Sequence, residues 1–419
     1  MSITVYPPYG STPFNPVYIQ FPIGSLDAFG RLQVASPYTL FDSQNRYAAD
    51  NQFDTATSGT GTSSFLSNEA AVKMEVTSGG AGSVIRQSYR SMPYQPGKGL
   101  LVLATFVMDN SNSVNLTQRV GYYNNQNGVF FQKTDGTVSF VLRSYVTGSV
   151  SDARTVNQAD WNGDKLDGTG PSGFTLDASK AQILWMDFEW LGVGSVRCGF
   201  VINGIFVLCH TFNNANLITN VYMTTATLTM RYEIVSTSAV SAYLKQICCT
   251  VISEGGYEQA SIEHVARRTS IFTNIDTAAN FYPVVSIRLA ATRLGAVVIP
   301  TRVQFLPTTL QNYEIALLKN PTLTGATWAA TVPSDSDVEY DVAATAISSP
   351  GVISQVGYIA NSGGGGQTNT IAATGYNWDL QLGASYSGTS DIYTLGVRTV
   401  SGATKGDGVG SISFYDLTQ

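Results

Sequence analysis

Two carboxylates, Asp187 and Glu189, are the residues whose types and spacing best fit acid–base chemistry. They lie two positions apart in an apolar stretch, so on a strand they share one face with their carboxylates ~6 Å apart. A glycosidase needs two carboxylates across a cleft, and Trp185, Phe188 and Trp190 are aromatic neighbours that fit a sugar. The same pattern is typical of a half-exposed strand whose acids face water, and we expect this second interpretation.

A long loop between residues 151 and 177 carries a second set of candidates. Asp160, Asn162 and Asp164 alternate as the first ligands of a calcium loop would. The EF-hand pattern then fails, because no Glu stands at its twelfth position. Trp161 is a candidate aromatic platform for a glycan, and a plain surface or subunit-contact loop is the simpler alternative. Whether 160–167 binds calcium is left open by the sequence.

Nucleophilic and metal chemistry have little support in this chain. A serine hydrolase needs a histidine near its serine, but the two histidines, His210 and His264, lie in an apolar strand and near an expected domain boundary, with no Gly-x-Ser-x-Gly motif. We predict structural histidines, no cofactor and no metal site. The four cysteines, Cys198, Cys209, Cys248 and Cys249, lack zinc-type spacing. Cys198 and Cys209 could be cross-strand neighbours, and we expect buried free thiols instead.

The composition predicts an all-β protein. Only 12% of the residues are charged, while Gly (40) and Tyr (22) are abundant, and long solvated helices would need more Glu and Lys. Residues 183–212 read as three successive strands. Their second turn is Asn203-Gly204, a strong hairpin signal because both residues tolerate a positive φ. An apolar meander of this kind requires a second sheet to cover it.

The strand pattern predicts two tandem antiparallel β-sandwiches with an extended N-terminal arm. We expect an arm at 1–25, a sandwich similar to concanavalin-like jelly rolls at 26–268, and a C-terminal sandwich at 269–419. The best helical candidate is 258–268. Prolines keep the arm extended, and its aromatic residues favour contact with another subunit over solvation. These assembly residues are Tyr6, Tyr9, Phe14, Tyr18 and Phe21.

Charge and hydropathy exclude two classes of partner. The net charge is −6 and no stripe of Lys or Arg is present, so binding to nucleic acid is not expected. The N-terminus lacks the pattern of a signal peptide, and no ~20-residue apolar run could form a transmembrane helix. We therefore expect a protein made in a cytoplasm, without membrane contact.

One block carries a resemblance to a known group. Residues 27–44 read DAFGRLQVASPYTLFDSQ, and downstream blocks FEWLGVG (188–194), RYEI (231–234) and QICCTVISEGG (246–256) follow in order. The chain resembles a group of virion-associated proteins of tailed bacteriophages, especially marine and environmental phages. One departure is Gln33, where the group has a basic residue. The resemblance spans about 26–320, implies a phage structural protein, and supplies no catalytic residue.

We therefore expect a non-enzymatic structural component on the outside of a phage head, collar or tail. Its partners would be other virion proteins and copies of itself in a closed ring such as a trimer, assembled in the host cytoplasm. The alternative is a glycan-binding receptor or adhesion module that uses Trp161 to bind a host-surface glycan. A polysaccharide depolymerase built on Asp187 and Glu189 is the remaining alternative.

Overall fold

The computed structural model describes residues 36–258, 261–277, 280–330, 336–360, 378–400 and 405–418, with the backbone of three further strands, 2–5, 17–20 and 369–372. The regular structure of this part of the chain is β, apart from two short 3₁₀ segments, η2 (Gln158–Asp160) and η3 (Trp378–Leu380). The prediction of an all-β protein with antiparallel sheets is confirmed.

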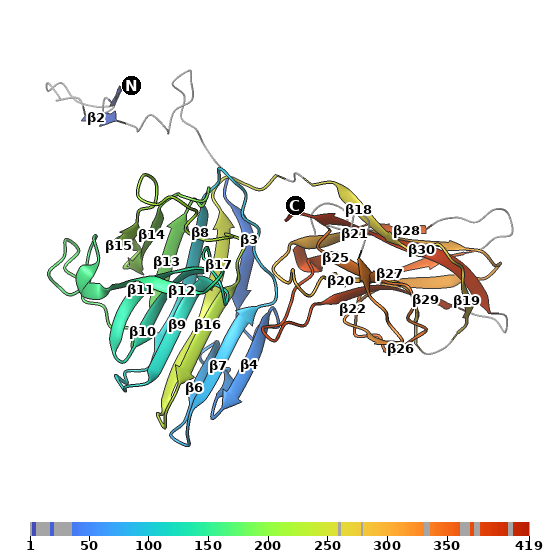
Figure 1. Ribbon diagram of the computed structural model, residues 1–419, viewed down its shortest axis with the longest axis horizontal. Helices are drawn as coiled ribbons and strands as arrows, with labels where there is room; N and C mark the ends of the chain where they lie inside the picture. Colours follow the sequence, from blue (N-terminus) through green and yellow to red (C-terminus); the bar gives the residue numbers. More distant parts are fainter. Residues whose placement is uncertain are drawn as a thin grey trace.

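The first sandwich consists of two antiparallel sheets packed face to face (Figure 1). The seven-stranded sheet has the order β12-β11-β10-β9-β16-β7-β4, and the eight-stranded sheet has the order β15-β14-β13-β8-β17-β6-β5, with β3 added beside β17. Their bounds are β3 Tyr38–Gln44, β4 Phe53–Gly59, β5 Thr62–Leu66, β6 Ala71–Val76, β7 Gly82–Ser88, β8 Leu100–Met108, β9 Leu116–Tyr123, β10 Gly128–Thr134, β11 Thr137–Ser144, β12 Ser151–Asn157, β13 Gln182–Phe188, β14 Val196–Ile202, β15 Ile205–Phe212, β16 Met230–Ser236 and β17 Ala242–Ser253.

Alternation along each strand builds the core between these sheets. On β8, buried and half-buried residues alternate over all nine positions, because successive side chains point to opposite faces. Phe131 of β10 is fully buried, and its ring centroid lies 5.8 Å from that of Phe106, 5.6 Å from Phe140 and 5.2 Å from Phe200. This aromatic cluster joins the two sheets.

The predicted meander is present as β13, β14 and β15. The turn between β14 and β15 has φ values of 52° at Asn203 and 78° at Gly204, as a type I′ hairpin requires. Gly199 in β14 has a packing role, because a Cβ there would lie 2.8 Å from the indole Nε1 of Trp185.

The second sandwich pairs a five-stranded sheet, β18-β30-β21-β28 with β19 beside β30, against a six-stranded sheet, β24-β25-β20-β29-β22-β27. Strands β23 and β26 form a separate two-stranded sheet, of which β26 contacts β20. The bounds are β18 Glu263–Arg267, β19 Phe272–Ile275, β20 Tyr282–Leu289, β21 Val298–Pro307, β22 Tyr313–Lys319, β23 Thr322–Thr324, β24 Ala329–Ala330, β25 Val338–Asp341, β26 Ala346–Ser349, β27 Val352–Ile359, β28 Asn369–Ala372, β29 Ile392–Thr399 and β30 Gly406–Asp416.

The segment 258–268 corrects two predictions. It forms no helix where it is described, and its residues Glu263–Arg267 are strand β18, which pairs with β30 about 150 residues later, from Glu263↔Tyr415 onward. Because β18 belongs to the second sandwich, the domain boundary lies after Ser253 and before Glu263, and not at 268. Local sequence favoured a helix, but hydrogen bonding to the edge of β30 decided the conformation.

The predicted arm contains two described strands, β1 (Ser2–Val5) and β2 (Val17–Gln20), which pair antiparallel from Ser2↔Gln20 to Val5↔Val17. Of the proposed assembly residues, Tyr6, Tyr9, Phe14 and Phe21 lie outside the described residues, and only the backbone of Tyr18 is described.

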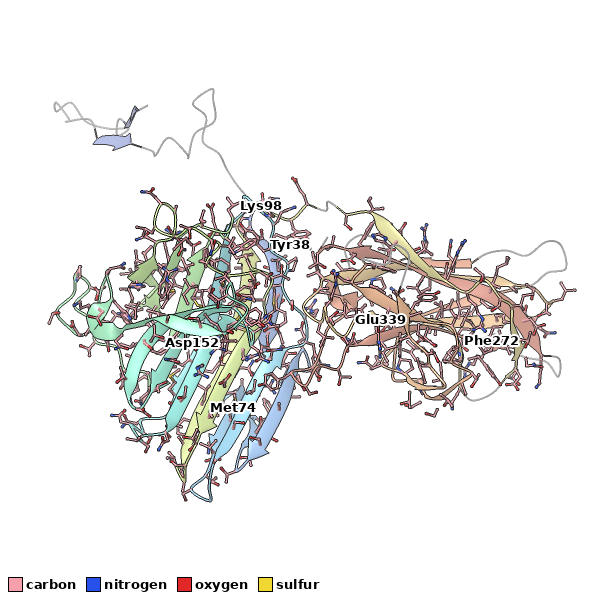
Figure 2. All side chains as sticks on the ribbon, viewed as in Figure 1. Tyr38, Met74, Lys98, Asp152, Phe272 and Glu339 are labelled. Atoms are coloured by element: carbon pink, nitrogen blue, oxygen red, sulfur yellow. The ribbon has the colours of Figure 1, made fainter. Side chains whose placement is uncertain are left out.

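The two sandwiches share core residues at their junction. Val297, Ile299 and Trp378 come from the C-terminal part of the chain, yet they pack in the core cluster of the first sandwich. The indole Nε1 of Trp378 donates to the hydroxyl of Tyr38, 2.8 Å away, and Tyr38 lies on the side of the first sandwich that faces the second (Figure 2). The tandem domains are therefore joined by packing as well as by the chain.

Candidate functional site

The strand carboxylates do not form a catalytic pair. Asp187 is 7% exposed and forms an ion pair with Arg197, its cross-strand neighbour on β14. Strand β13 ends at Phe188, so Glu189 lies beyond it in an exposed position. Because one carboxylate is bound by a guanidinium and the other has left the strand, the geometry does not provide two free carboxylates facing one cleft.

The prediction of an exposed aromatic platform at Trp161 is wrong. This side chain is only 2% exposed, its ring centroid lies 4.7 Å from that of Phe140, and its Nε1 donates to the carbonyl oxygen of Val156 at 3.1 Å. The loop folds back over the end of the sandwich and inserts the indole into the core. A sugar has no ring face to stack on here.

The remainder of that loop protects a sheet edge. The backbone N–H groups of Gly163 and Asp164 donate to Cys209 and Leu208 at 2.8 and 2.9 Å, and so cover the outer edge of β15. Asp164 accepts N–H bonds from Leu166 and Ser172. Burial acts to raise the pKa of Asp164, but these hydrogen bonds outweigh it and lower that pKa. In the described part of the chain, no group of three or more His, Cys, Asp or Glu side chains is placed to hold a metal.

The predicted structural role of His210 agrees with its surroundings. His210 is 7% exposed, and its Nδ1 accepts the N–H of Asn162 at 3.3 Å. Burial, followed by the charge of Arg154, lowers the pKa of His210. All four cysteines are free thiols, of which three are buried, and burial raises the pKa of Cys209 to about 12. A thiol of this kind is a poor nucleophile at neutral pH.

An unusual cluster lies instead on the outer face of the seven-stranded sheet. Tyr123, Phe130 and Val141 are fully buried there, apart from the main core, and the rings of Tyr123 and Phe130 are 4.4 Å apart. Neighbouring strands supply the arginines that cover them. The guanidinium carbon of Arg143 lies 5.1 Å from the ring centroid of Phe130, and that of Arg119 lies 5.7 Å from it. Cation–π contacts therefore stabilise this outer layer.

Arg231 is the central charged residue of this face. Its side chain is 2% exposed, and its guanidinium lies between two tyrosines, 4.9 Å from the ring centroid of Tyr123 and 5.1 Å from that of Tyr386 in the second sandwich. Its Nε donates to Gln87 Oε1 and its Nη1 donates to Asn125 Oδ1, both at 2.8 Å. Arg231 thus connects the two domains.

Glu233 balances part of this positive charge. Its carboxylate accepts a hydrogen bond from Arg119 Nη1 at 2.6 Å and lies 3.7 Å from Arg231 Nη1. The Tyr123 hydroxyl is 3.4 Å from the same carboxylate. Burial, followed by the nearby charge of Glu233, raises the pKa of Tyr123 well above its ordinary value. Two guanidinium groups thus share one carboxylate.

A cavity of about 360 Å³ opens beside Arg231, between the two sandwiches. Strands β7 and β16 and the turn 124–126 provide one wall, while the loops 291–295 and 384–388 of the second sandwich provide the other. Its lining is mixed polar and apolar, with the side chains of Gln87, Tyr89, Asn124, Asn125, Gln126, Arg231, Arg293 and Tyr386 among the polar members.

Hydrogen bonds across the domain junction hold this cavity open. Ala384 N–H donates to the carbonyl oxygen of Tyr89 at 2.8 Å, and Tyr386 N–H donates to Asp54 Oδ2 at 2.8 Å. Gln381 Nε2 also donates to the backbone of Ser91 at 2.8 Å. The two walls are therefore fixed relative to each other before any ligand binds.

Sequence reasoning missed this site because its residues come from separate segments of both domains. One signal was present: in Met230–Ser236 two charged residues, Arg231 and Glu233, alternate with the buried Met230, Tyr232 and Ile234. Charges on the outward face of an otherwise apolar central strand require partners, but the sequence does not say which.

No family model matches this chain, and no curated protein does. Solved structures with a similar fold include a protein of unknown function from Shewanella oneidensis MR-1, with 9% identity and a TM-score of 0.36, covering 60% of this chain and 100% of that one. The carbohydrate recognition domain of Emp47p has 9% identity and a TM-score of 0.32, covering 57% and 100%. The carbohydrate esterase of the Shiga toxin-encoding bacteriophage phi24B has 10% identity and a TM-score of 0.34, covering 52% and 100%.

These similarities concern general architecture only, since every identity is 10% or lower and every TM-score is below 0.5. What the structure itself shows is that the first domain is a sandwich of two facing antiparallel sheets. Among the described residues, no helix is both long and apolar enough to cross a membrane.

Proposed function

We propose that this protein is a non-enzymatic glycan-binding module whose ligand occupies the cavity between the two sandwiches. The observation that carries the proposal is the set of fixed amide donors in that cavity. Gln87 and Asn125 each use their amide oxygen to accept from Arg231, which leaves their NH₂ groups as donors for a ligand. Convergent polar groups of this kind in a preformed cavity recognise hydroxyl-rich molecules.

Aromatic and hydroxyl groups complete the recognition surface. Tyr386 is partly exposed and has one ring contact with Arg231, and Tyr89 and Ser385 also line the cavity. A pyranose presents an apolar face to a ring and hydroxyls to its neighbours, so tyrosines beside amides fit this ligand class. Trp161 does not line this cavity, so the proposed glycan site lies elsewhere than the site predicted from the sequence.

The test is binding of the purified protein to a glycan array that includes bacterial surface polysaccharides. We expect Tyr386→Ala to reduce binding of the recognised glycan about tenfold or more, because an aromatic ring that a bound ligand covers contributes strongly to affinity. Tyr47→Ala is the matched control, since Tyr47 is 82% exposed and does not line the cavity. Failure of the unmodified protein to bind any glycan would refute the proposal.

We propose, as a second and compatible role, that the chain is a structural component of a tailed-phage virion, on the outer surface of the head, collar or tail. The resemblance carried by 27–44 supports this role. An exposed apolar patch on the outer face of β13 and β15 adds to it, with Ile183 40%, Phe206 52% and Leu208 40% exposed. Exposed apolar patches are typical of protein–protein contacts, as self-association into a ring or docking on another virion protein would require.

The N-terminal segment provides the test of assembly. Deletion of residues 1–25 is expected to leave a folded protein that is no longer incorporated into particles, measured by immunoblotting of purified virions. Incorporation should also be lost when the five aromatic residues of the segment are replaced by serine, because apolar contacts drive such association. Normal incorporation of the truncated protein would contradict the assembly role.

A further inference from the structure

The cavity between the sandwiches has a one-sided charge. Among the described residues that line it are two arginines, Arg231 and Arg293, and no aspartate or glutamate. This contrasts with the chain as a whole, which has 29 acidic and 23 basic residues. A cavity lined by charge of one sign attracts ligands of the opposite sign, since its walls focus the field.

The nearby carboxylates are already engaged and do not line the cavity. Glu233 is shared between Arg119 and Arg231, Asp337 accepts from Arg293 Nη1 at 2.6 Å, and Asp54 accepts the backbone N–H of Tyr386. Each of these carboxylates already accepts from an arginine or a backbone N–H, and none of them lines the cavity, so a ligand there contacts the guanidinium of Arg293 and not its paired carboxylate.

Arg293 is both accessible and held in place. Its side chain is 49% exposed, and a tight turn fixes its backbone, with Arg293 N–H donating to Ala290 at 2.8 Å and Ala296 N–H donating to Arg293 at 3.0 Å. Asp337 uses only the Nη1 of this side chain, and within the described parts of the chain the other N–H donors of its five remain for a ligand. Arg231 adds a buried positive charge from the opposite wall.

We infer that the ligand is an acidic saccharide, whose carboxylate accepts hydrogen bonds from Arg293 in the field of Arg231. The inference rests on the proposed glycan binding and names its ligand class. A planar guanidinium matches a carboxylate with two parallel hydrogen bonds, and the amides of Gln87 and Asn125 take the hydroxyls of the same sugar. Neutral saccharides lack the group that Arg293 recognises.

A matched pair of ligands tests the charge requirement by isothermal titration calorimetry. The probes are an oligogalacturonate and its methyl ester, which share the sugar chain and differ at the carboxylate, charged in the acid and capped by a methyl group in the ester. We expect the acid to bind about tenfold more tightly than the ester, and its affinity to fall as NaCl rises from about 20 to about 300 mM. Arg293→Gln should bring the affinity for the acid close to that for the ester.

Arg302→Gln is the control variant, because Arg302 pairs with Glu263 at 3.0 Å in the same sandwich but does not line the cavity; it should bind like the unmodified protein. Equal affinity for acid and ester would overturn the inference while leaving glycan binding intact. Displacement of the bound acid by an equimolar amount of inorganic phosphate would also overturn it, since the site would then recognise free anions. Absence of binding to either probe and to the glycan array would remove both proposals.

Discussion

Replacement of Trp378 by alanine is expected to lower the free energy of unfolding by about 3–5 kcal/mol, the usual cost of removing a buried tryptophan. Trp378 is 9% exposed and packs in the core of the first sandwich, although it belongs to a segment of the second. Its ring centroid lies 5.0 Å from that of Tyr257, and its Nε1 donates to Tyr38. The substitution therefore removes packing that joins the domains.

The variant should also separate the unfolding of the two sandwiches. Differential scanning calorimetry should change from one transition to two, because domains that share no core unfold independently. Glycan binding should weaken with it, since the cavity walls come from both domains. Trp328→Ala serves as control: Trp328 is half-buried against Arg288 within the second sandwich. A single unchanged transition for Trp378→Ala would show that the junction does not couple the domains.

The second large loss of folding stability is expected on substitution of Glu233. Replacement by alanine leaves Arg119 and the buried Arg231 without their shared carboxylate, and breaking a buried ion pair from one side costs about 3–5 kcal/mol. The side chain of Glu233 is 7% exposed, that of Arg231 is 2% and that of Arg119 is 22%. Water therefore reaches these guanidinium groups poorly and replaces little of the lost ion pairing. Urea unfolding followed by tryptophan fluorescence measures the change.

An exposed ion pair of the same sandwich provides the comparison. Glu69 pairs with Lys245 at 2.5 Å, but its side chain is 51% exposed, so Glu69→Ala should cost less than about 1 kcal/mol. Glu233→Gln keeps the shape and some hydrogen bonds and should give an intermediate loss. If Glu233→Ala and Glu69→Ala destabilise the protein equally, the outer-face network does not stabilise the fold.

Local chemistry in the sequence was sufficient to predict the fold class. Asn203-Gly204 permits the positive φ of a hairpin turn wherever it lies, and the continuous apolar run Leu100–Met108 predicts a strand buried within a sheet, as β8 is between β13 and β17. These features depend on residues adjacent in the chain. Propensity and period-2 alternation therefore determine them without knowledge of the partner strands.

Local signals failed where distant segments compete. The helical pattern at 258–268 was overridden by the pairing of β18 with β30. The polar residues around Trp161 suggested an exposed side chain, but its indole packs on Phe140. Asp187 and Glu189 have the spacing of a catalytic pair, but Arg197 on the next strand binds one of them. In each case a contact with a residue distant in the sequence stabilises the observed conformation more than the local preference stabilises the predicted one.

The sequence by itself determined that this protein is built from β-strands, that residues 183–212 form a three-stranded meander, and that its few charged residues must find partners. Only the tertiary structure decided where those charges meet. Gln87, Asn125, Arg231, Arg293 and Tyr386 come from five segments of two domains, and the docking of the sandwiches brings them to one cavity. Docking depends on surface shape and on hydrogen bonds such as Ala384 to Tyr89, which no pattern within a single segment encodes.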